Sequence, residues 1–331
     1  MIRNLDKNRL LAGGDLFNKD TQNKILVAID GSKQAMEAVN YVATIFPPQT
    51  TRVVLFHVSE PISDLFSEFK NNKYYQSKLP GLRTWVADEQ KHIAEYMQEA
   101  SSHLTEAGFD RDRIEIKITQ KKLDTTRDIV KESYNDYDAV VVGRTGASRF
   151  KDFLLKSVAI KLVGQIKHLP VIVIGGTPAS KRVCIGYDGS ESAMRGVTWV
   201  SSLLGGSTCK IELLSLLSQK GTFWLDGEEF HLPAGSTPNS FEESCKIITP
   251  CVNNAKKRLI KAGIPEENIS VRIEILNVDP AERIVDEVTS CGFGSVVVGR
   301  RALVSFFEEA FVGRVSSKVL KKANNVAVWI T

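Results

Sequence analysis

The sequence predicts an α/β protein made of two tandem doubly wound domains, each with a five-stranded parallel sheet and helices on both faces. Three observations predict this class. The chain of 331 residues suits two domains of about 150 residues better than one. One stretch of the first half recurs in the second half. Apolar runs typical of buried parallel strands also alternate with helical segments throughout.

The recurrence indicates a tandem duplication. "KILVAIDGSKQAMEAVNYV" at Lys24 aligns without gaps with "RVCIGYDGSESAMRGVTWV" at Arg182, an offset of 158, and seven of the 19 positions are identical. The two "VVVGR" runs match at an offset of 156, and the runs "VIVIGG" and "VAVWIT" at one of 155. Three anchors in one order predict a polar extension at 1–23 and domains at 24–177 and 178–331.

Each copy is expected to alternate strand and helix, because near-continuous Val, Ile and Leu runs are typical of parallel strands buried on both faces. In the first copy, strands are expected at 24–30, 51–58, 114–119, 138–143 and 171–175. The helices between them are expected at 33–45, about 82–107, 124–134 and 151–168. The strands of the second copy are expected near 182–187, 209–216, 269–276, 294–299 and 325–330.

The composition excludes several classes of protein. A net charge of +4, with basic and acidic residues interleaved, gives no nucleic-acid-binding surface. No run of about 18 apolar residues is present, so no membrane insertion is expected. The N-terminal segment lacks the apolar core of a signal peptide, and the cysteine count is odd, so we expect a cytoplasmic location. The cysteine spacings favour no metal site.

Two loops of the first copy form a candidate ligand site. Asp30-Gly31-Ser32 follows the first strand and Gly143-Arg144-Thr145-Gly146 follows the fourth. If the strand order reverses between these strands, both loops face one crevice. The glycines would let a phosphate approach the backbone, and Asp30 would accept hydrogen bonds from a base or ribose. The alternative is structural: Asp30 and Ser32 cap the first helix and Gly143 is a turn.

The motifs "VAIDGS", "HVSEP" and "VVVGRTGASRFKDFLLKSVA" resemble the universal stress protein family, and both copies share the resemblance over about residues 24–331. It implies sheets of order 3-2-1-4-5 that pair through the last strand, as a pseudo-dimer within the chain and as a possible homodimer. In one subclass it also implies ATP binding, with or without magnesium, through the motif G-2x-G-9x-G-[ST].

The first copy keeps three of the four motif positions: Gly143, Gly146 and Ser157, with Lys156 in place of the third glycine. The resemblance also places Asp30 and the backbone of Val58 near the adenine. Arg144 lies within the motif loop. Lys156 would either crowd the phosphates or bind them through its ammonium group.

The second copy departs further from the motif. Asp188 and Gly299 are kept, but Ala302 replaces the second glycine, and Gly313 comes one position late with Arg314 after it. We therefore expect this copy to be degenerate for ATP, although Arg300, Arg301 and Arg314 would still suit an anion.

Two functions remain open. The first is a stress-response protein that binds ATP as a regulatory ligand in its first domain, with a mainly structural second domain. The alternative is a non-nucleotide adaptor that binds a protein or an apolar ligand through the long connections at 60–81 and 218–240. No catalytic constellation is recognisable, so no enzyme beyond slow ATP hydrolysis is expected.

Overall fold

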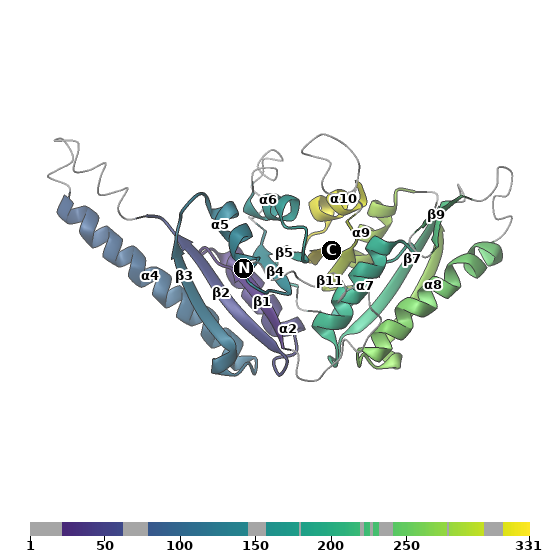
Figure 1. Cartoon of the computed structure of the whole chain (residues 1–331), viewed down its shortest axis with the longest axis horizontal. Coiled ribbons are helices and arrows are strands. Elements are labelled where there is room, and N and C mark those ends of the chain that lie inside the picture. The colour runs from purple at the N-terminus through teal and green to yellow at the C-terminus, as the bar shows by residue number, and fades with distance from the viewer. Residues whose placement is uncertain are drawn as a thin grey trace, which may run out of the picture.

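The computed structural model describes residues 22–61, 79–144, 157–178, 180–218, 222–225, 228–231, 241–276, 278–300 and 314–331. Below, residues 22–178 are called the first half and residues 180–331 the second half. The two halves lie side by side, with α4 at one end of the molecule and α8 at the other (Figure 1).

A ten-stranded sheet runs through both halves in the order β10-β7-β6-β11-β12-β5-β4-β1-β2-β3. The first half contributes β1 (Asn23–Ala28), β2 (Thr51–Ser59), β3 (Ile114–Gln120), β4 (Ala139–Gly143) and β5 (Val171–Ile174). The second half contributes β6 (Arg182–Gly186), β7 (Lys210–Ser218), β10 (Ile269–Leu276), β11 (Ser295–Val298) and β12 (Ala327–Ile330). Each half is parallel with the order 3-2-1-4-5, which confirms the predicted tandem doubly wound fold.

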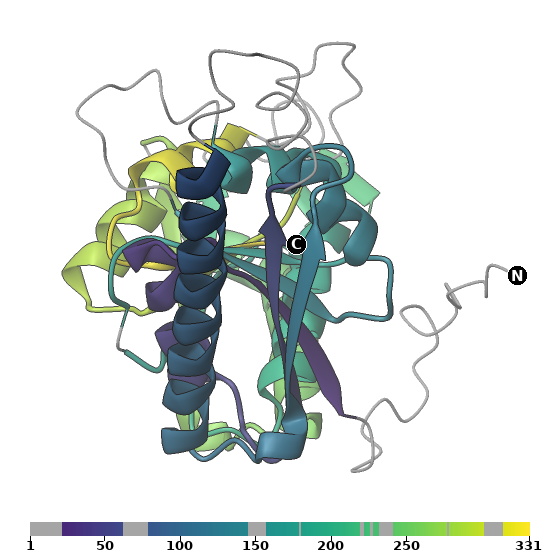
Figure 2. The same cartoon turned by 90° about the vertical axis from the view of Figure 1, so that its left-hand side faces the viewer.

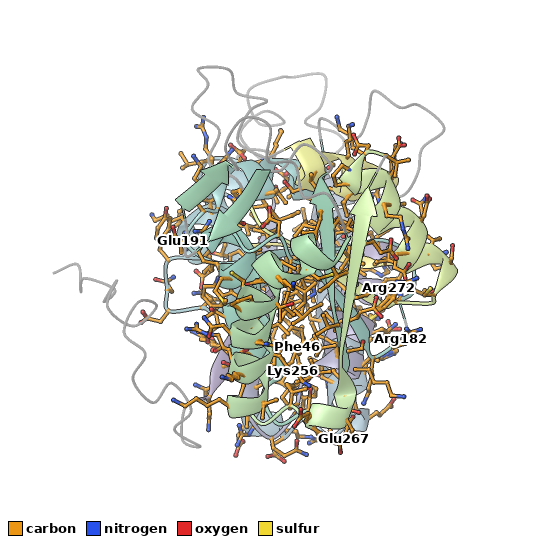
Figure 3. The ribbon with its side chains drawn as sticks, turned by 90° about the vertical axis from the view of Figure 1, so that its right-hand side faces the viewer. Phe46, Arg182, Glu191, Lys256, Glu267 and Arg272 are labelled. Atoms are coloured by element: carbon orange, nitrogen blue, oxygen red, sulfur yellow. The ribbon has the colours of Figure 1, made fainter. Side chains whose placement is uncertain are left out.

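Helices cover both faces of the sheet. One face packs against α2 (Lys33–Ile45), α4 (Leu79–Glu106), α7 (Glu191–Leu204) and α8 (Phe241–Lys261). The other face packs against α5 (Thr125–Glu132), α6 (Val158–Gln165), α9 (Pro280–Ser290) and α10 (Arg314–Lys322). Helix α4 runs along the outer strands β2 and β3 (Figure 2), and β10 forms the opposite edge, where Arg272 lies (Figure 3).

The halves join through their last strands. Strands β5 and β12 pair antiparallel, with Val173 opposite Val328. Beside this junction, the fully buried Trp329 stacks on Phe46 of the first half at 5.9 Å and donates a hydrogen bond of 2.8 Å to the Tyr41 hydroxyl. The expected pseudo-dimer is therefore present. Both edges of β5 and of β12 are already paired, so the last strands offer no edge to a second chain.

The structure corrects two details of the expected fold. Val171 pairs with Val140, and Val328 pairs with Val296, the equivalent of Val140 at the offset of 156. The last strands therefore correspond at an offset of 157 (328 − 171), not 155. A shift of two residues leaves each side chain on the same face, so the apolar pattern alone does not detect it.

The second correction concerns the expected loop at 218–240. It contains an antiparallel pair, β8 (Thr222–Leu225) and β9 (Glu228–His231). Of the helix expected at 151–168, residues 151–156 lie outside the described part of the chain, and α6 itself spans 158–165. No helix in the described ranges is long and apolar enough to cross a membrane, and the five cysteines form no disulfide.

Candidate functional site

A cavity of about 650 Å³ opens at the carboxyl ends of the first-half strands. Residues from the ends of β1, β2, β3 and β4 line it, together with the amino ends of α2, α5 and α6 and a part of α4. The strand order reverses between β1 and β4 here, which is where doubly wound proteins bind ligands. Of the predicted site residues, Asp30, Val58 and Gly143 all line this cavity.

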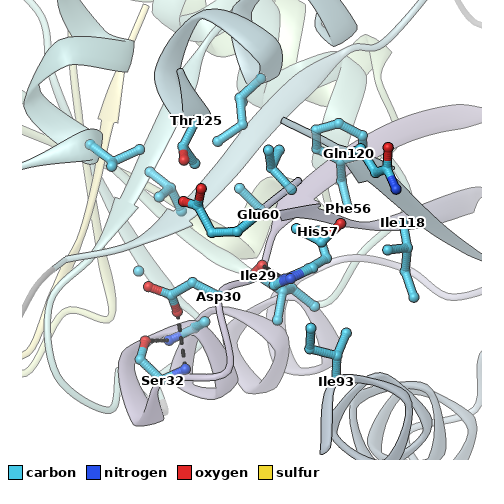
Figure 4. Close-up of a pocket in the computed structure, with 18 of the residues that line it drawn as sticks. Ile29, Asp30, Ser32, Phe56, His57, Glu60, Ile93, Ile118, Gln120 and Thr125 are labelled. Carbon is cyan, nitrogen blue, oxygen red and sulfur yellow. Dashed lines mark hydrogen bonds between the residues drawn. The ribbon is translucent and has the colours of Figure 1, made fainter. Parts of the chain in front are cut away.

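Asp30 is held by the loop that starts α2. Gly31 has a φ of 80°, a conformation that favours glycine, and it turns the chain so that the Ser32 amide donates to Asp30 Oδ1 at 3.0 Å. Ser32 in turn caps α2, because its Oγ accepts from the Ala35 amide at 3.2 Å. The expected capping role is therefore real. The exposed Asp30 side chain also keeps its second carboxylate oxygen directed away from Ser32 (Figure 4).

Gly143 is the last residue of β4, and its lack of a side chain serves packing. A Cβ at this position would lie 2.3 Å from the Gln34 carbonyl oxygen at the start of α2. The close approach brings the Asp30 loop and the end of β4 to the same cavity wall. The need for glycine here thus follows from the fold, before any ligand is considered.

His57 and Tyr96 add polar groups near the Asp30 loop. His57 is buried, and its Nδ1 lies 2.8 Å from the Ile29 carbonyl oxygen, so that this ring nitrogen carries the proton. The Tyr96 hydroxyl donates to the Ser32 carbonyl at 3.0 Å. Burial and the nearby negative charge of Asp30 raise the pKa of Tyr96 well above its usual range, so it stays a neutral donor.

Several lining residues are not among the site residues that the sequence predicts. Those labelled in Figure 4 are Thr125 from α5, Ile93 from α4, Ile118 and Gln120 from β3, and Glu60 from the end of β2. Ile129 of α5 also lines the cavity. Glu60 lies in the quoted "HVSEP" motif, and Gln120 and Thr125 flank a predicted strand end, so their position at the carboxyl edge was the available signal.

The lining is largely apolar, and its charged members are acidic. Asp30, Glu60 and Glu89 are carboxylates, and no Lys or Arg is among the described residues that line the cavity. Lys121 lies nearby and forms an ion pair of 2.7 Å with Glu60 Oε1. A negatively charged ligand group would therefore need a positive partner other than a described lining side chain.

The amino end of α6 offers such a partner. Val158 and Ala159, its first two residues, line the cavity, and Ser157 caps the helix by accepting from the Ile160 amide at 3.3 Å. The free amides of a helix amino end carry partial positive charge. Ser157 itself is buried beside this end, whereas Gly146 and Lys156 lie outside the described residues.

Arg144 points away from the cavity. Its Nη1 donates to the Ala323 carbonyl at 2.6 Å and its Nη2 to the Lys321 carbonyl at 2.8 Å, both at the carboxyl end of α10 in the second half. Burial among these groups lowers the pKa of the guanidinium. The structure therefore does not bring Arg144 together with Asp30 and Val58.

The second half repeats the capping loop but changes its surroundings. Asp188 Oδ1 accepts from the Ser190 amide at 3.1 Å, and a Cβ on Gly299 would lie 2.7 Å from the Ser192 carbonyl oxygen. At the position equivalent to Ile29 stands Tyr187, whose buried ring extends to α8, where its hydroxyl donates to the Cys251 carbonyl at 3.1 Å. Gly313 lies outside the described residues.

Within the described parts of both halves, no group of three or more His, Cys, Asp or Glu side chains is arranged to hold a metal ion. Magnesium that accompanies a nucleotide is usually held by the phosphates, by waters and by one or two carboxylates.

Comparison with known proteins is consistent with this architecture. The family model described as "Universal stress protein family" matches residues 22–175 and 179–330. A universal stress protein from Archaeoglobus fulgidus aligns over 93% of this chain and 98% of its own, with 17% identity and a TM-score of 0.59. No curated protein matches the chain.

Two further structures each align with about half of the chain. One is a universal stress protein in complex with cAMP, at 19% identity and a TM-score of 0.33, covering 45% of this chain and 94% of its own. The other is a family protein from Arabidopsis thaliana with AMP bound, at 18% identity and a TM-score of 0.28, covering 45% and 89%.

Proposed function

The chain belongs to the universal stress protein family, with two domains in tandem, and on that premise we propose that it binds an adenine nucleotide in the cavity of its first domain. The proposed ligand is ATP, acting as a regulator rather than as a substrate. The second domain is degenerate for the nucleotide and mainly structural. A cytoplasmic location is part of the same proposal.

The observation that carries the proposal is the meeting of Asp30, Val58 and Gly143 in one cavity at the reversal of strand order. Asp30 would accept a hydrogen bond from the adenine amino group or from a ribose hydroxyl. The amino end of α6, capped by Ser157, would face the phosphates. Gly146 and Lys156 are proposed for the same role from the motif alone.

The backbone of Val58 suits the edge of a base. Pairing between β1 and β2 ends at Ala28 and Phe56, and the Ile29 amide donates to the Phe56 carbonyl at 2.9 Å. Along a strand, backbone groups two residues apart point the same way, so the N–H and C=O of Val58 point toward the end of β1. A planar base there would find both a donor and an acceptor.

The contrast between the domains supports a single site. Where Ile29 leaves room in the first domain, the Tyr187 ring extends to α8 in the second. The second domain also lacks the middle glycine of the motif, at Ala302. We therefore expect one nucleotide per chain, not two.

The first test is to denature freshly purified protein and quantify the released adenine nucleotide by chromatography. Calorimetric titration with ATP, AMP and cAMP then follows on the emptied protein. One nucleotide per chain, lost in Asp30→Ala and in Gly146→Val but kept in Asp188→Ala, is the expected result. The matched Asp188→Ala variant removes the equivalent carboxylate from the second domain, where it accepts from the Ser190 amide. Equal loss in Asp30→Ala and Asp188→Ala, or no binding at millimolar ATP, would contradict the proposal.

A second candidate is an apolar ligand. Ile118 lines the cavity and is 48% exposed, Ile116 two residues earlier is 42% exposed, and no described cationic side chain lines the wall. If an apolar fluorescent probe binds the emptied protein and ATP does not displace it, this candidate replaces the nucleotide.

A further inference from the structure

We propose that Arg300, a residue of the second domain, is a positioning residue for the cavity of the first domain. It caps the carboxyl end of α6, the helix whose amino end lines that cavity. The inference rests on the proposed nucleotide site, and it concerns how that site is held in place across the domain boundary.

The contact joins the two domains directly. Arg300 Nη1 donates to the Ile166 carbonyl oxygen at 2.8 Å. Ile166 is the C-cap of α6 and is fully buried, and its own amide donates to the Leu162 carbonyl at 2.8 Å. The last carbonyls of a helix have no partner within the helix and carry partial negative charge, so a guanidinium there supplies both a donor and a matching charge.

The far end of the same helix forms the cavity wall. Helix α6 has eight residues, and its first two, Val158 and Ala159, line the cavity. A helix of about two turns is not stable on its own and takes its position from the contacts at its ends and on its buried face. Fixing Ile166 therefore helps to fix Val158 and Ala159.

The arrangement is reciprocal. Arg144 of the first domain donates to the Lys321 and Ala323 carbonyls at the end of α10, the helix equivalent to α6. Arg144 and Arg300 are equivalent in the repeat, and each directly follows the glycine at the end of the fourth strand, Gly143 or Gly299. The second domain has thus kept its glycine–arginine pair even though the rest of its nucleotide motif has changed. The hydrogen bonds that each arginine makes to a helix of the other domain explain why both domains have this pair.

Arg300 lies in an environment that disfavours its charge. Burial, with Arg195 close by, lowers its pKa to about 10. Its Nε and Nη2 are buried with no hydrogen-bond partner among the described residues, whereas its Nη1 has the bond to Ile166. The cost of burying the guanidinium therefore offsets part of what this bond contributes to stability.

The experiment compares Arg300→Ala, Arg300→Lys and Arg258→Ala in the full chain. Arg258 is the matched control, because it donates a single bond of 2.6 Å to Thr198 inside the second domain. We expect Arg300→Ala to weaken adenine nucleotide binding about tenfold. Because the buried Ile166 carbonyl loses its donor, the thermal midpoint should fall, but the chain should still unfold in one cooperative transition. Arg300→Lys, which keeps a cationic donor, should recover part of the affinity. Arg258→Ala should bind as the wild type does.

Amide hydrogen exchange of α6 without nucleotide gives an independent reading. Exchange at Leu162 to Ile166 should accelerate in Arg300→Ala and stay unchanged in Arg258→Ala. Wild-type affinity in Arg300→Ala, or an equal loss in Arg258→Ala, would overturn the inference. If the wild type binds no nucleotide, the proposed function fails, and unchanged exchange in Arg300→Ala would separately overturn the capping role.

Discussion

At the scale of single residues, Gly143 and Gly299 show that a motif residue can be required by the fold itself. Each lies where a Cβ would meet the backbone of the first helix of its domain, at Gln34 or Ser192. Their presence in both domains therefore does not report on ligand binding. The residues that distinguish the domains are elsewhere, at Tyr187 and in the altered loop after Gly299.

This packing predicts the effect of a single methyl group. Gly143→Ala and Gly299→Ala should each lower the free energy of unfolding by roughly 1–3 kcal/mol, because the neighbouring backbone has to shift. Urea denaturation measures both, and Gly164→Ala, where an added Cβ meets no atom within 4 Å, is the control. A Gly299→Ala variant as stable as the wild type would show that the second domain does not need this close approach.

Tyr41 gives a second prediction for a single residue, through the two hydrogen bonds of its hydroxyl. It accepts from Trp329 Nε1 at 2.8 Å and lies 2.7 Å from Ser295 Oγ, so one buried group of the first domain bonds two residues of the second. Tyr41→Phe leaves both partners unpaired and should cost about 1–3 kcal/mol in unfolding free energy. Tyr134→Phe, at an exposed ring, should cost almost nothing. Equal effects in the two variants would rule out this account.

At this scale the sequence predicts the position of some site residues and not of others, for a physical reason. Asp30, Val58 and Gly143 follow strand ends of one sheet, so topology predicts their meeting, while their ligand role stays a prediction. Arg144 was assigned to the ligand because it lies between motif residues. Its contacts are 177 and 179 residues away along the chain, in the other domain, and no local pattern indicates them.

At the scale of elements, an ion pair ties the same strand and helix together in both domains. Lys117 of β3 bonds Glu132 of α5 at 2.7 Å, and Arg272 of β10 bonds Glu287 of α9 at 2.6 Å. Burial alone would raise the pKa of Glu132, but its bonds from Lys117 and Tyr137 outweigh burial and hold it below the usual value. The pKa of Glu287 is likewise lowered against burial, through Cys291 and Arg283 among others.

The lowered pKa values of Glu132 and Glu287 determine how the stability of the protein changes in acid. A carboxylate whose pKa is lower in the folded state stabilises the fold above its unfolded pKa, near 4.5, and this contribution disappears as the pH falls through the folded value. Unfolding free energy should therefore drop from about pH 5 downward. Glu132→Gln should be less stable at pH 7. In denaturant titrations at a series of pH values, its unfolding free energy should fall less steeply in acid than that of the wild type. If its unfolding free energy falls as steeply in acid as that of the wild type, other groups cause the acid destabilisation.

The helix caps give another element-scale prediction. Ser32 and Ser190 cap α2 and α7 with bonds of 3.2 Å to the Ala35 and Ala193 amides. Ser32→Ala and Ser190→Ala should each lose about 1 kcal/mol in denaturant titrations. Nucleotide affinity should fall in Ser32→Ala more than in Ser190→Ala, because only Ser32 adjoins the cavity.

The elements themselves were largely predictable. The helix at 33–45 and all ten sheet strands follow from continuous apolar runs and a cap, which are local signals. The sequence does not predict the pair β8–β9, because each strand has only four residues, the shortest length at which strand alternation can be recognised. The sequence pattern also does not distinguish an offset of 155 from the observed 157 for the last strands, because a shift of two residues keeps every side chain on the same face of the sheet.

At the scale of the whole molecule, the core is shared by the two domains. The sheet runs unbroken through β5 and β12, and one apolar cluster includes Phe46 and Val39 of the first domain with Trp329 and Cys209 of the second. The two domains should therefore unfold in one cooperative transition, unlike domains joined only by a linker. Scanning calorimetry should give equal calorimetric and van't Hoff enthalpies. Two resolved transitions would contradict this.

The antiparallel junction of β5 and β12 also has a consequence for the cell. Two separate subunits obey mass action, and dilution drives them apart. Here the partners are covalently tethered, and their encounter is unimolecular at any abundance. A few copies per cell are assembled as completely as many, so a response carried by this protein would scale in direct proportion to its copy number.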